Sequence, residues 1–147
     1  MQSNILADAD GRKAYAVIME TGDEAMSCLQ RFVAAEGIVS AQFTAIGAFS
    51  DAVLKYFDWE AKAYREIPVS EQVEVASLIG DVAETPNGKA ALHIHTVLGR
   101  RDGSAMAGHL GKAHVRPTLE VILTESPVHL RKKHDPESGL ALIRTEG

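Results

Sequence analysis

The sequence predicts an α+β fold in which a largely antiparallel β-sheet is joined by one main helix near the N-terminus. Three observations support this prediction. One early segment repeats apolar residues at helical spacing, the rest of the chain consists of strand-like runs, and most connections between those runs are short enough for hairpins. With 147 residues the chain is expected to form a single domain, residues 1–147, whose core needs no disulfide or metal.

The first expected elements are a strand and the helix. Residues 13–20 form a β-branched and aromatic run that suits a strand. Thr21 and Glu24 then have the spacing of a capping box, so a helix is expected to follow. Gly37 is placed to end this helix in the left-handed conformation. The apolar stripe that the helix is expected to pack on the sheet consists of Met26, Leu29, Phe32 and Val33.

Eight further runs predict strands. They are separated by turn residues, among them Gly47, Gly88, Gly103 and Pro117. Consecutive hairpins of this kind favour antiparallel pairing over alternating strand and helix units. The predicted strands cover residues 40–48, 52–58, 64–68, 72–82, 90–99, 104–111, 115–124 and 140–144.

Composition argues against several classes of protein. The chain has 15 Lys+Arg against 20 Asp+Glu, a net charge of -5, and its basic residues are scattered. This composition disfavours sequence-independent binding to a nucleic-acid backbone. No apolar run approaches the ~20 residues of a membrane span. The single cysteine, Cys28, cannot close an intrachain disulfide, and the N-terminal residues lack a signal-peptide pattern. A cytoplasmic protein with no membrane partner is therefore expected.

Three of the six histidines are candidate metal ligands. Strand alternation places His93 and His95 on one face, opposite a more apolar face. Whether His109 joins them depends on the loop between the two strands. A two-residue turn would point His109 away. A three-residue loop with a left-handed Gly103 would set His95 opposite His109, and a five-residue loop would set His93 opposite His109.

Either odd loop length would let the three imidazoles converge on one divalent ion, because directly opposed Cβ atoms lie about 4.5–5.5 Å apart. Three imidazoles with an open fourth position are typical of catalytic zinc, although copper, iron and nickel also accept imidazole. The alternative is that His93 and His95 are solvated surface residues. The other histidines, interpreted as surface or hydrogen-bonding residues, are His114, His129 and His134.

Two carboxylates and one arginine are further candidates. Glu120 and Glu74 lie on partly apolar strand faces, where a carboxylate is suited to move protons in catalysis. The alternative is that each is solvated or paired with arginine. Arg100, near a hairpin end, is a candidate clamp for a planar anion. The aromatic side chains within residues 56–64 span one hairpin and are interpreted as core or as a subunit contact.

Five segments occur together in a characteristic order and spacing. They are Phe43-Thr-Ala-Ile-Gly-Ala48, Glu74-Val-Ala-Ser-Leu-Ile-Gly80, His93-Ile-His95, Gly108-His-Leu110 and Pro117-Thr-Leu-Glu-Val121. In this arrangement the chain resembles the plant and prokaryote conserved (PPC) domain family, as a prokaryotic single-domain member. The resemblance covers roughly residues 15–143.

This resemblance implies a compact α+β subunit that assembles as a homotrimer. It also implies a three-histidine metal site, which carries over to His93, His95 and His109. At the level of fold the family is similar to acetolactate decarboxylase, a zinc enzyme with a comparable histidine set. In plant members the domain is joined to an AT-hook that holds the minor groove of DNA. This chain has no Arg-Gly-Arg-Pro segment, so DNA binding by the domain alone is not expected.

Two functions are therefore expected as alternatives. In the first, the protein is a trimeric assembly or binding module whose metal site, best matched by zinc, is vestigial, structural or used to hold a small-molecule ligand. In the second, it is a metal-dependent lyase of decarboxylase type that acts on a small oxo-acid. Glu120 would then be the proton-moving group, with Glu74 as the second choice and Arg100 holding the acid.

Overall fold

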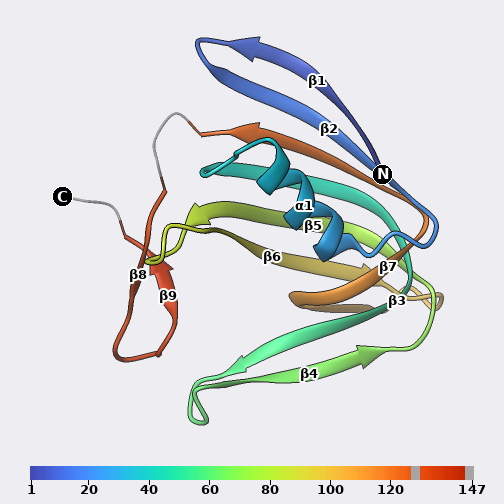
Figure 1. Cartoon of the computed structure of the whole chain (residues 1–147). Helices are drawn as coiled ribbons and strands as arrows, with labels where there is room; N and C mark the ends of the chain where they lie inside the picture. Colours follow the sequence, from blue (N-terminus) through green and yellow to red (C-terminus); the bar gives the residue numbers. More distant parts are fainter. Residues whose placement is uncertain (127–129, 145–147) are drawn as a thin grey trace.

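The computed structural model describes residues 1–126 and 130–144, and its fold is the α+β fold expected from the sequence (Figure 1). No helix in these ranges is long and apolar enough to cross a membrane. The elements in chain order are β1 (Gln2–Ala9), β2 (Arg12–Glu20), α1 (Ala25–Ala35), β3 (Ala41–Asp58), β4 (Ala63–Val69), β5 (Val73–Glu84), β6 (Ala90–Gly99), β7 (Ala105–Glu125), β8 (Lys132–His134) and β9 (Ala141–Ile143).

Seven strands form one antiparallel sheet with the order β1-β2-β7-β6-β5-β3-β4, and β3 also pairs with β7. The pairings β7–β3, β3–β5, β5–β6 and β6–β7 therefore form a closed circuit. β1 and β2 extend the sheet along β7, and β4 extends it along the last part of β3. Figure 1 shows the β3–β4 hairpin projecting away from the strands that α1 covers.

Helix α1 begins after Glu24. The side chain of this residue accepts hydrogen bonds from the backbone N–H groups of Met26 (3.2 Å) and Ser27 (2.9 Å), which would otherwise lack partners. The predicted capping box that starts at Thr21 is therefore wrong, because Glu24 is the cap residue itself. Glu24 also accepts a hydrogen bond from the backbone N–H of Ala113 in β7 (3.2 Å), so the same carboxylate joins the helix to the sheet.

The apolar stripe of α1 packs against the sheet as predicted. Leu29, Phe32 and Val33 are buried and Met26 is partly buried. The ring of Phe32 meets Tyr15 of β2 edge to face, with ring centroids 5.2 Å apart. Each large apolar side chain buried in this way contributes about 1.5–3 kcal/mol to folding. The opposite face of the central strands remains outside this core, and the histidines lie on that face.

Two pairs of predicted strands are single long strands. The strands predicted at 40–48 and 52–58 are parts of β3, which begins at Ala41, and those predicted at 104–111 and 115–124 are parts of β7, which begins at Ala105. The expected break at Gly47 is instead an irregularity in the pairing, where the strand bends but continues. Gly47 has φ +152°, and a Cβ at this position would overlap the backbone of β7, so the glycine permits a close approach of two strands.

The chain termini differ most from the sequence prediction. Strand β1 was not expected, because all of its residues are exposed and show no alternation of apolar and polar side chains. Among the described strands it pairs with β2 alone. The strand expected at residues 140–144 is shorter, and it forms a separate two-stranded sheet with β8, which was also not expected.

Candidate metal centre

The loop between β6 and β7 places His109 directly opposite His95. The backbone N–H of Arg100 donates to the carbonyl of Ser104 (2.8 Å), and the N–H of Gly103 donates to the carbonyl of Arg100 (2.9 Å). Gly103 has φ +83°, the left-handed conformation. This is the three-residue loop considered from the sequence, and its register pairs His95 with His109. The predicted convergence of the histidines on one face is therefore confirmed.

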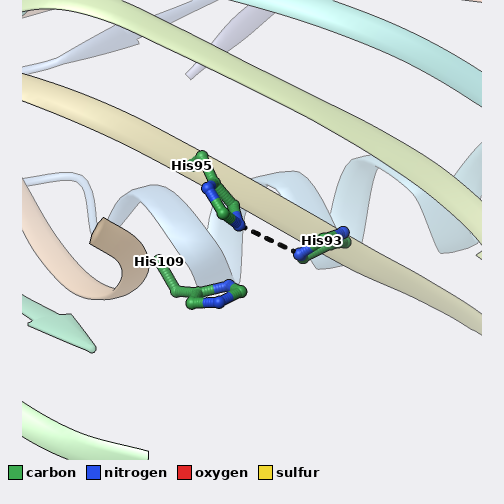
Figure 2. Close-up of side chains that lie close together, drawn as sticks. All are labelled: His93, His95 and His109. Atoms are coloured by element: carbon green, nitrogen blue, oxygen red, sulfur yellow. Dashed lines mark hydrogen bonds between the residues drawn. The ribbon is translucent and has the colours of Figure 1, made fainter. Parts of the chain in front are cut away.

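The three imidazoles turn toward one another, as Figure 2 shows. One nitrogen from each of His93, His95 and His109 lies within 4.8 Å of the other two. The Nε2 atoms of His93 and His95 are 3.2 Å apart. Two nitrogens that bind the same tetrahedral zinc ion at 2.0–2.1 Å would be about 3.3 Å apart. The ligand type and the spacing of this pair therefore fit a zinc-like divalent ion.

The surroundings of the cluster keep two of the rings neutral. Burial, together with the nearby His95 and His93, lowers the pKa of His109 from its usual 6.5 to about 4. Burial and the neighbouring His93 also lower the pKa of His95. A neutral imidazole presents a lone pair, whereas a protonated one must lose a proton before it can bind a metal. Both residues are therefore prepared to act as ligands near neutral pH.

A carboxylate that the sequence analysis missed lies beside the cluster. Asp81 is paired with His93 across β5 and β6, and its Oδ2 is 3.4 Å from the His93 Nδ1. The loop between these strands fixes their register, so it could have been used to predict this pairing. Gly88 has φ +78°, and the N–H of Thr85 donates to the carbonyl of Lys89. Counting back one residue at a time on each strand from that pair reaches Asp81 and His93.

The β3–β4 hairpin adds a series of aromatic rings next to His109. Tyr64 meets the His109 ring edge to face, with centroids 5.1 Å apart. Phe57 packs on Tyr64 at 5.2 Å, and Trp59 packs on Phe57 at 6.4 Å. Because Tyr64 and Trp59 are exposed, the interpretation of these residues as core is wrong. A subunit contact remains a prediction for them. The rings connect the hairpin tip with the histidine cluster.

A hollow of about 630 Å³ opens beside His93 and His95 on the exposed face of the sheet. A volume of this size suits a small molecule. Strands β3, β5, β6 and β7 form the walls, and Asp81 is the one acidic residue among the lining residues. The other residues that line the hollow include apolar Phe43, Ile79 and Ile122 and polar Gln42, Thr44 and Thr124.

The remaining predicted site residues lie elsewhere. Glu120 and Glu74 both line a second hollow of about 390 Å³ near Gly47, and neither lines the hollow beside the histidines. Arg100 lies at the β6–β7 loop, where its Nε donates to a carboxylate oxygen of Glu71 (2.7 Å). Its guanidinium therefore already holds a carboxylate of the protein itself.

The other histidines do not join the cluster within the described residues. His114 contacts Asp51 through its Nδ1 atom (2.8 Å), and this hydrogen bond lowers the pKa of Asp51. His134 is exposed on β8. His129 lies outside the described residues. The surface or hydrogen-bonding role expected for His114 and His134 is consistent with these positions.

Solved structures of other proteins share this fold. A PPC protein of Pyrococcus horikoshii is 28% identical with a TM-score of 0.83, and the match covers 99% of this chain and 96% of that one. A metal-containing protein of Archaeoglobus fulgidus is 32% identical with a TM-score of 0.81, covering 90% and 94%. A protein of Bacteroides thetaiotaomicron, provisionally described as DNA-binding, is 25% identical with a TM-score of 0.83, covering 97% and 96%.

A more distant structure, from Staphylococcus aureus, is described as similar to alpha-acetolactate decarboxylase. It is 13% identical with a TM-score of 0.57, and the match covers 79% of this chain and 53% of that one, which supports a likeness of fold alone. No curated protein matches the sequence. The model of the Plants and Prokaryotes Conserved (PCC) domain matches residues 7–127, a range that contains all three clustered histidines. The chain therefore belongs to the Plants and Prokaryotes Conserved domain family.

Proposed function

We propose that this protein is a homotrimeric binding module that holds one zinc ion through His93, His95 and His109 and binds a small molecule at the open side of that ion. The observation that carries the proposal is the convergence of three imidazole nitrogens within 4.8 Å. When bound, zinc would supply a Lewis-acidic position for an oxygen or nitrogen atom of the ligand. The metal-containing relative from Archaeoglobus fulgidus, 32% identical, supports the metal part of the proposal.

The hollow beside the histidines defines the kind of small molecule that fits. Thr44 and Thr124 offer hydroxyl groups, while Ile79 and Ile122 offer apolar contacts. Its lining contains no Lys or Arg among the described residues. A small ligand with one metal-binding polar group and a short apolar part therefore suits the hollow better than a multiply charged anion, whose desolvation would lack compensation.

A binding module is preferred to a lyase because the two expected proton-moving groups are not in this hollow. Glu120 and Glu74 line the second hollow instead. A general acid or base must come within hydrogen-bond reach of the atom that gains or loses a proton. Their separate placement within the subunit removes the specific support for decarboxylase-like chemistry at the histidine cluster.

The homotrimer is proposed from the family resemblance and from an apolar surface on the face that holds the histidines. Ile46 and Ile79 are 61% and 56% exposed, and Ile122 and Val97 are also exposed. These residues come from β3, β5, β7 and β6, which are neighbours in the sheet. Apolar surface of this kind favours association, because contact with another subunit removes it from water.

Zinc binding of the metal-free protein tests the metal part. Isothermal titration with Zn²⁺ should give one site per chain for the wild type, and His109→Ala should lose that site because it removes one of three ligands. His134→Ala is the matched control, since His134 is exposed on β8 and lies outside the cluster. Unchanged zinc binding by His109→Ala would contradict the proposal.

Light scattering tests the assembly. The wild type should have a mass close to three times the 15.8 kDa of the chain. Ile79→Asp should reduce that mass, because it places a charge in the apolar surface. Leu142→Asp, an equivalent change at an exposed apolar residue of the separate β8–β9 sheet, should leave it unchanged. A wild-type monomer at high concentration would contradict the homotrimer.

The small-molecule part is tested with cobalt in place of zinc, because the visible spectrum of Co²⁺ reports changes in its ligands. The spectrum of the Co²⁺-loaded protein should shift on addition of at least one compound from a panel of small carboxylic, hydroxy and oxo acids. No shift with any of them would contradict ligand binding at an open metal position.

Duplex DNA is not among the proposed partners. The relative from Bacteroides thetaiotaomicron is provisionally described as DNA-binding, whereas this chain has a net charge of -5 and its sequence contains no Arg-Gly-Arg-Pro segment. Phosphate attraction needs clustered basic residues. Filter binding at physiological salt should therefore detect no tight complex, and a complex that survives competitor DNA would overturn this expectation.

A further inference from the structure

The carboxylate of Asp81 stands next to one of the three histidines without joining their cluster. Asp81 in β5 is directly paired with His93 in β6, and its Oδ2 is 3.4 Å from the His93 Nδ1. Among the residues that the structure describes, the group of candidate ligand atoms that lie within 4.8 Å of one another contains histidine nitrogens only. Asp81 is therefore placed behind a ligand and is not itself part of the ligand set.

The two nitrogens of the His93 ring point at different partners. Nε2 lies 3.2 Å from the Nε2 of His95, while Nδ1 faces Asp81. A neutral imidazole carries its proton on one nitrogen and a lone pair on the other. A carboxylate at Nδ1 favours the form in which Nδ1 is protonated, since a carboxylate can only accept. The lone pair then lies on Nε2, on the side of the cluster.

The second oxygen of Asp81 has no evident structural purpose. Oδ1 is buried and has no hydrogen-bond partner among the described residues. A buried acceptor without a partner is costly to folding, so packing alone does not explain a carboxylate at this position. A hydrophobic or smaller residue would avoid that cost. A role in orienting His93 would instead account for an acidic group at this position.

We propose that Asp81 is a positioning residue that fixes the ring orientation and tautomer of His93 for metal binding. This inference rests on the proposed zinc site and adds to it a specific outer partner. Carboxylates that accept a hydrogen bond from a ligand histidine commonly strengthen metal affinity 10–100-fold. Neither His95 nor His109 has a carboxylate partner of this kind within the described residues, so the effect of Asp81 is specific to one ligand.

The test compares Zn²⁺ affinity among the wild type and three variants, measured by competition with a chromophoric chelator. Asp81→Ala should bind Zn²⁺ about 10–100-fold more weakly. Asp81→Asn should lose less, because its amide oxygen, like a carboxylate oxygen, can accept a hydrogen bond from Nδ1. Asp51→Asn is the matched control, since it changes an equivalent aspartate–histidine contact, that of His114, outside the metal cluster. It should bind Zn²⁺ as the wild type does.

A second measurement separates orientation from general damage to the fold. Nitrogen-15 NMR of the metal-free protein should show His93 mainly protonated on Nδ1 in the wild type and in Asp81→Asn. Asp81→Ala should lose that preference. Its thermal unfolding should not occur at a lower temperature than that of the wild type, because the change removes an unpaired buried oxygen.

The outcomes distinguish this inference from the proposed function. A wild-type protein that binds no Zn²⁺ would overturn the proposed function together with the inference. A wild type that binds Zn²⁺ while Asp81→Ala binds it equally well would overturn the positioning role alone. An affinity lost to the same extent in Asp81→Ala and in Asp51→Asn would also overturn it, because the loss would then not depend on the contact with His93.

Discussion

Replacement of His109 by glutamine should make the metal-free protein less sensitive to acid. In the folded chain, burial and the neighbouring histidines lower the pKa of His109 from 6.5 to about 4. Between these two values the unfolded chain binds a proton at this residue and the folded chain does not. The free energy of unfolding therefore decreases as the pH falls through this window. The loss is absent well above pH 6.5 and complete below about pH 4.

The size of this effect follows from the same two pKa values. At pH 5 the shift corresponds to about 2 kcal/mol of lost unfolding free energy for a histidine that is shielded from water. Because the side chain of His109 is only partly buried, solvent screening reduces the expected loss to about 1 kcal/mol. Glutamine cannot take up a proton, so the variant lacks this loss while all other groups still titrate.

Urea unfolding in the presence of a chelator measures the effect. Between about pH 7.5 and about pH 5, the wild type should lose about 1 kcal/mol more unfolding free energy than His109→Gln does. His134→Gln is the control, since His134 is exposed on β8 and should leave the pH dependence as in the wild type. Equal losses in the wild type and in His109→Gln would refute the reasoning.

Three further substitutions test the fold and the limits of the site. Gly47→Ala should give little folded protein by circular dichroism, because its Cβ would overlap the backbone of β7; a folded product would contradict that close approach. Glu24→Ala should lower the urea unfolding free energy by about 1–2 kcal/mol through loss of the helix cap, and an unchanged midpoint would contradict the cap. Arg100→Ala should leave Zn²⁺ affinity unchanged. It should alter the free energy of unfolding by less than about 1 kcal/mol, since it removes a surface ion pair with Glu71. Weaker Zn²⁺ binding by this variant would show that Arg100 contributes to the metal site.

The arrangement of the three clustered histidines could be predicted because it depends on local rules of strand and loop geometry. Strand alternation fixes the common face of His93 and His95, and the left-handed Gly103 fixes the loop length that pairs His95 with His109. The same kind of counting from the β5–β6 loop would have reached Asp81. It was missed because a single acidic residue in a strand has no pattern of its own, and its importance depends on the residue opposite.

Other features depend on contacts between distant parts of the chain. Gly47 favours a turn when judged from sequence alone, whereas here it serves the approach of β3 to β7 within one long strand. Strand β1 has no buried face and therefore no alternation to detect. Glu120 was expected near the metal because its predicted strand follows that of His109 and it lies beside an apolar residue on its own strand face, and Glu74 was the second choice. Both instead line a second hollow away from the histidines, because which residues share a hollow depends on how several strands are arranged in space, and the sequence pattern does not give that arrangement.

The aromatic rings of the β3–β4 hairpin include an intrinsic fluorescent probe of the histidine cluster. Trp59 is the one tryptophan of the chain, and two rings, Phe57 and Tyr64, lie between it and His109 in a series of three ring contacts. Tryptophan emission responds to its surroundings, so we expect a movement of Tyr64 against the His109 ring to change the emission of Trp59 at the hairpin tip. Events at the histidine cluster can therefore be followed through intrinsic fluorescence, with no label attached to the molecule.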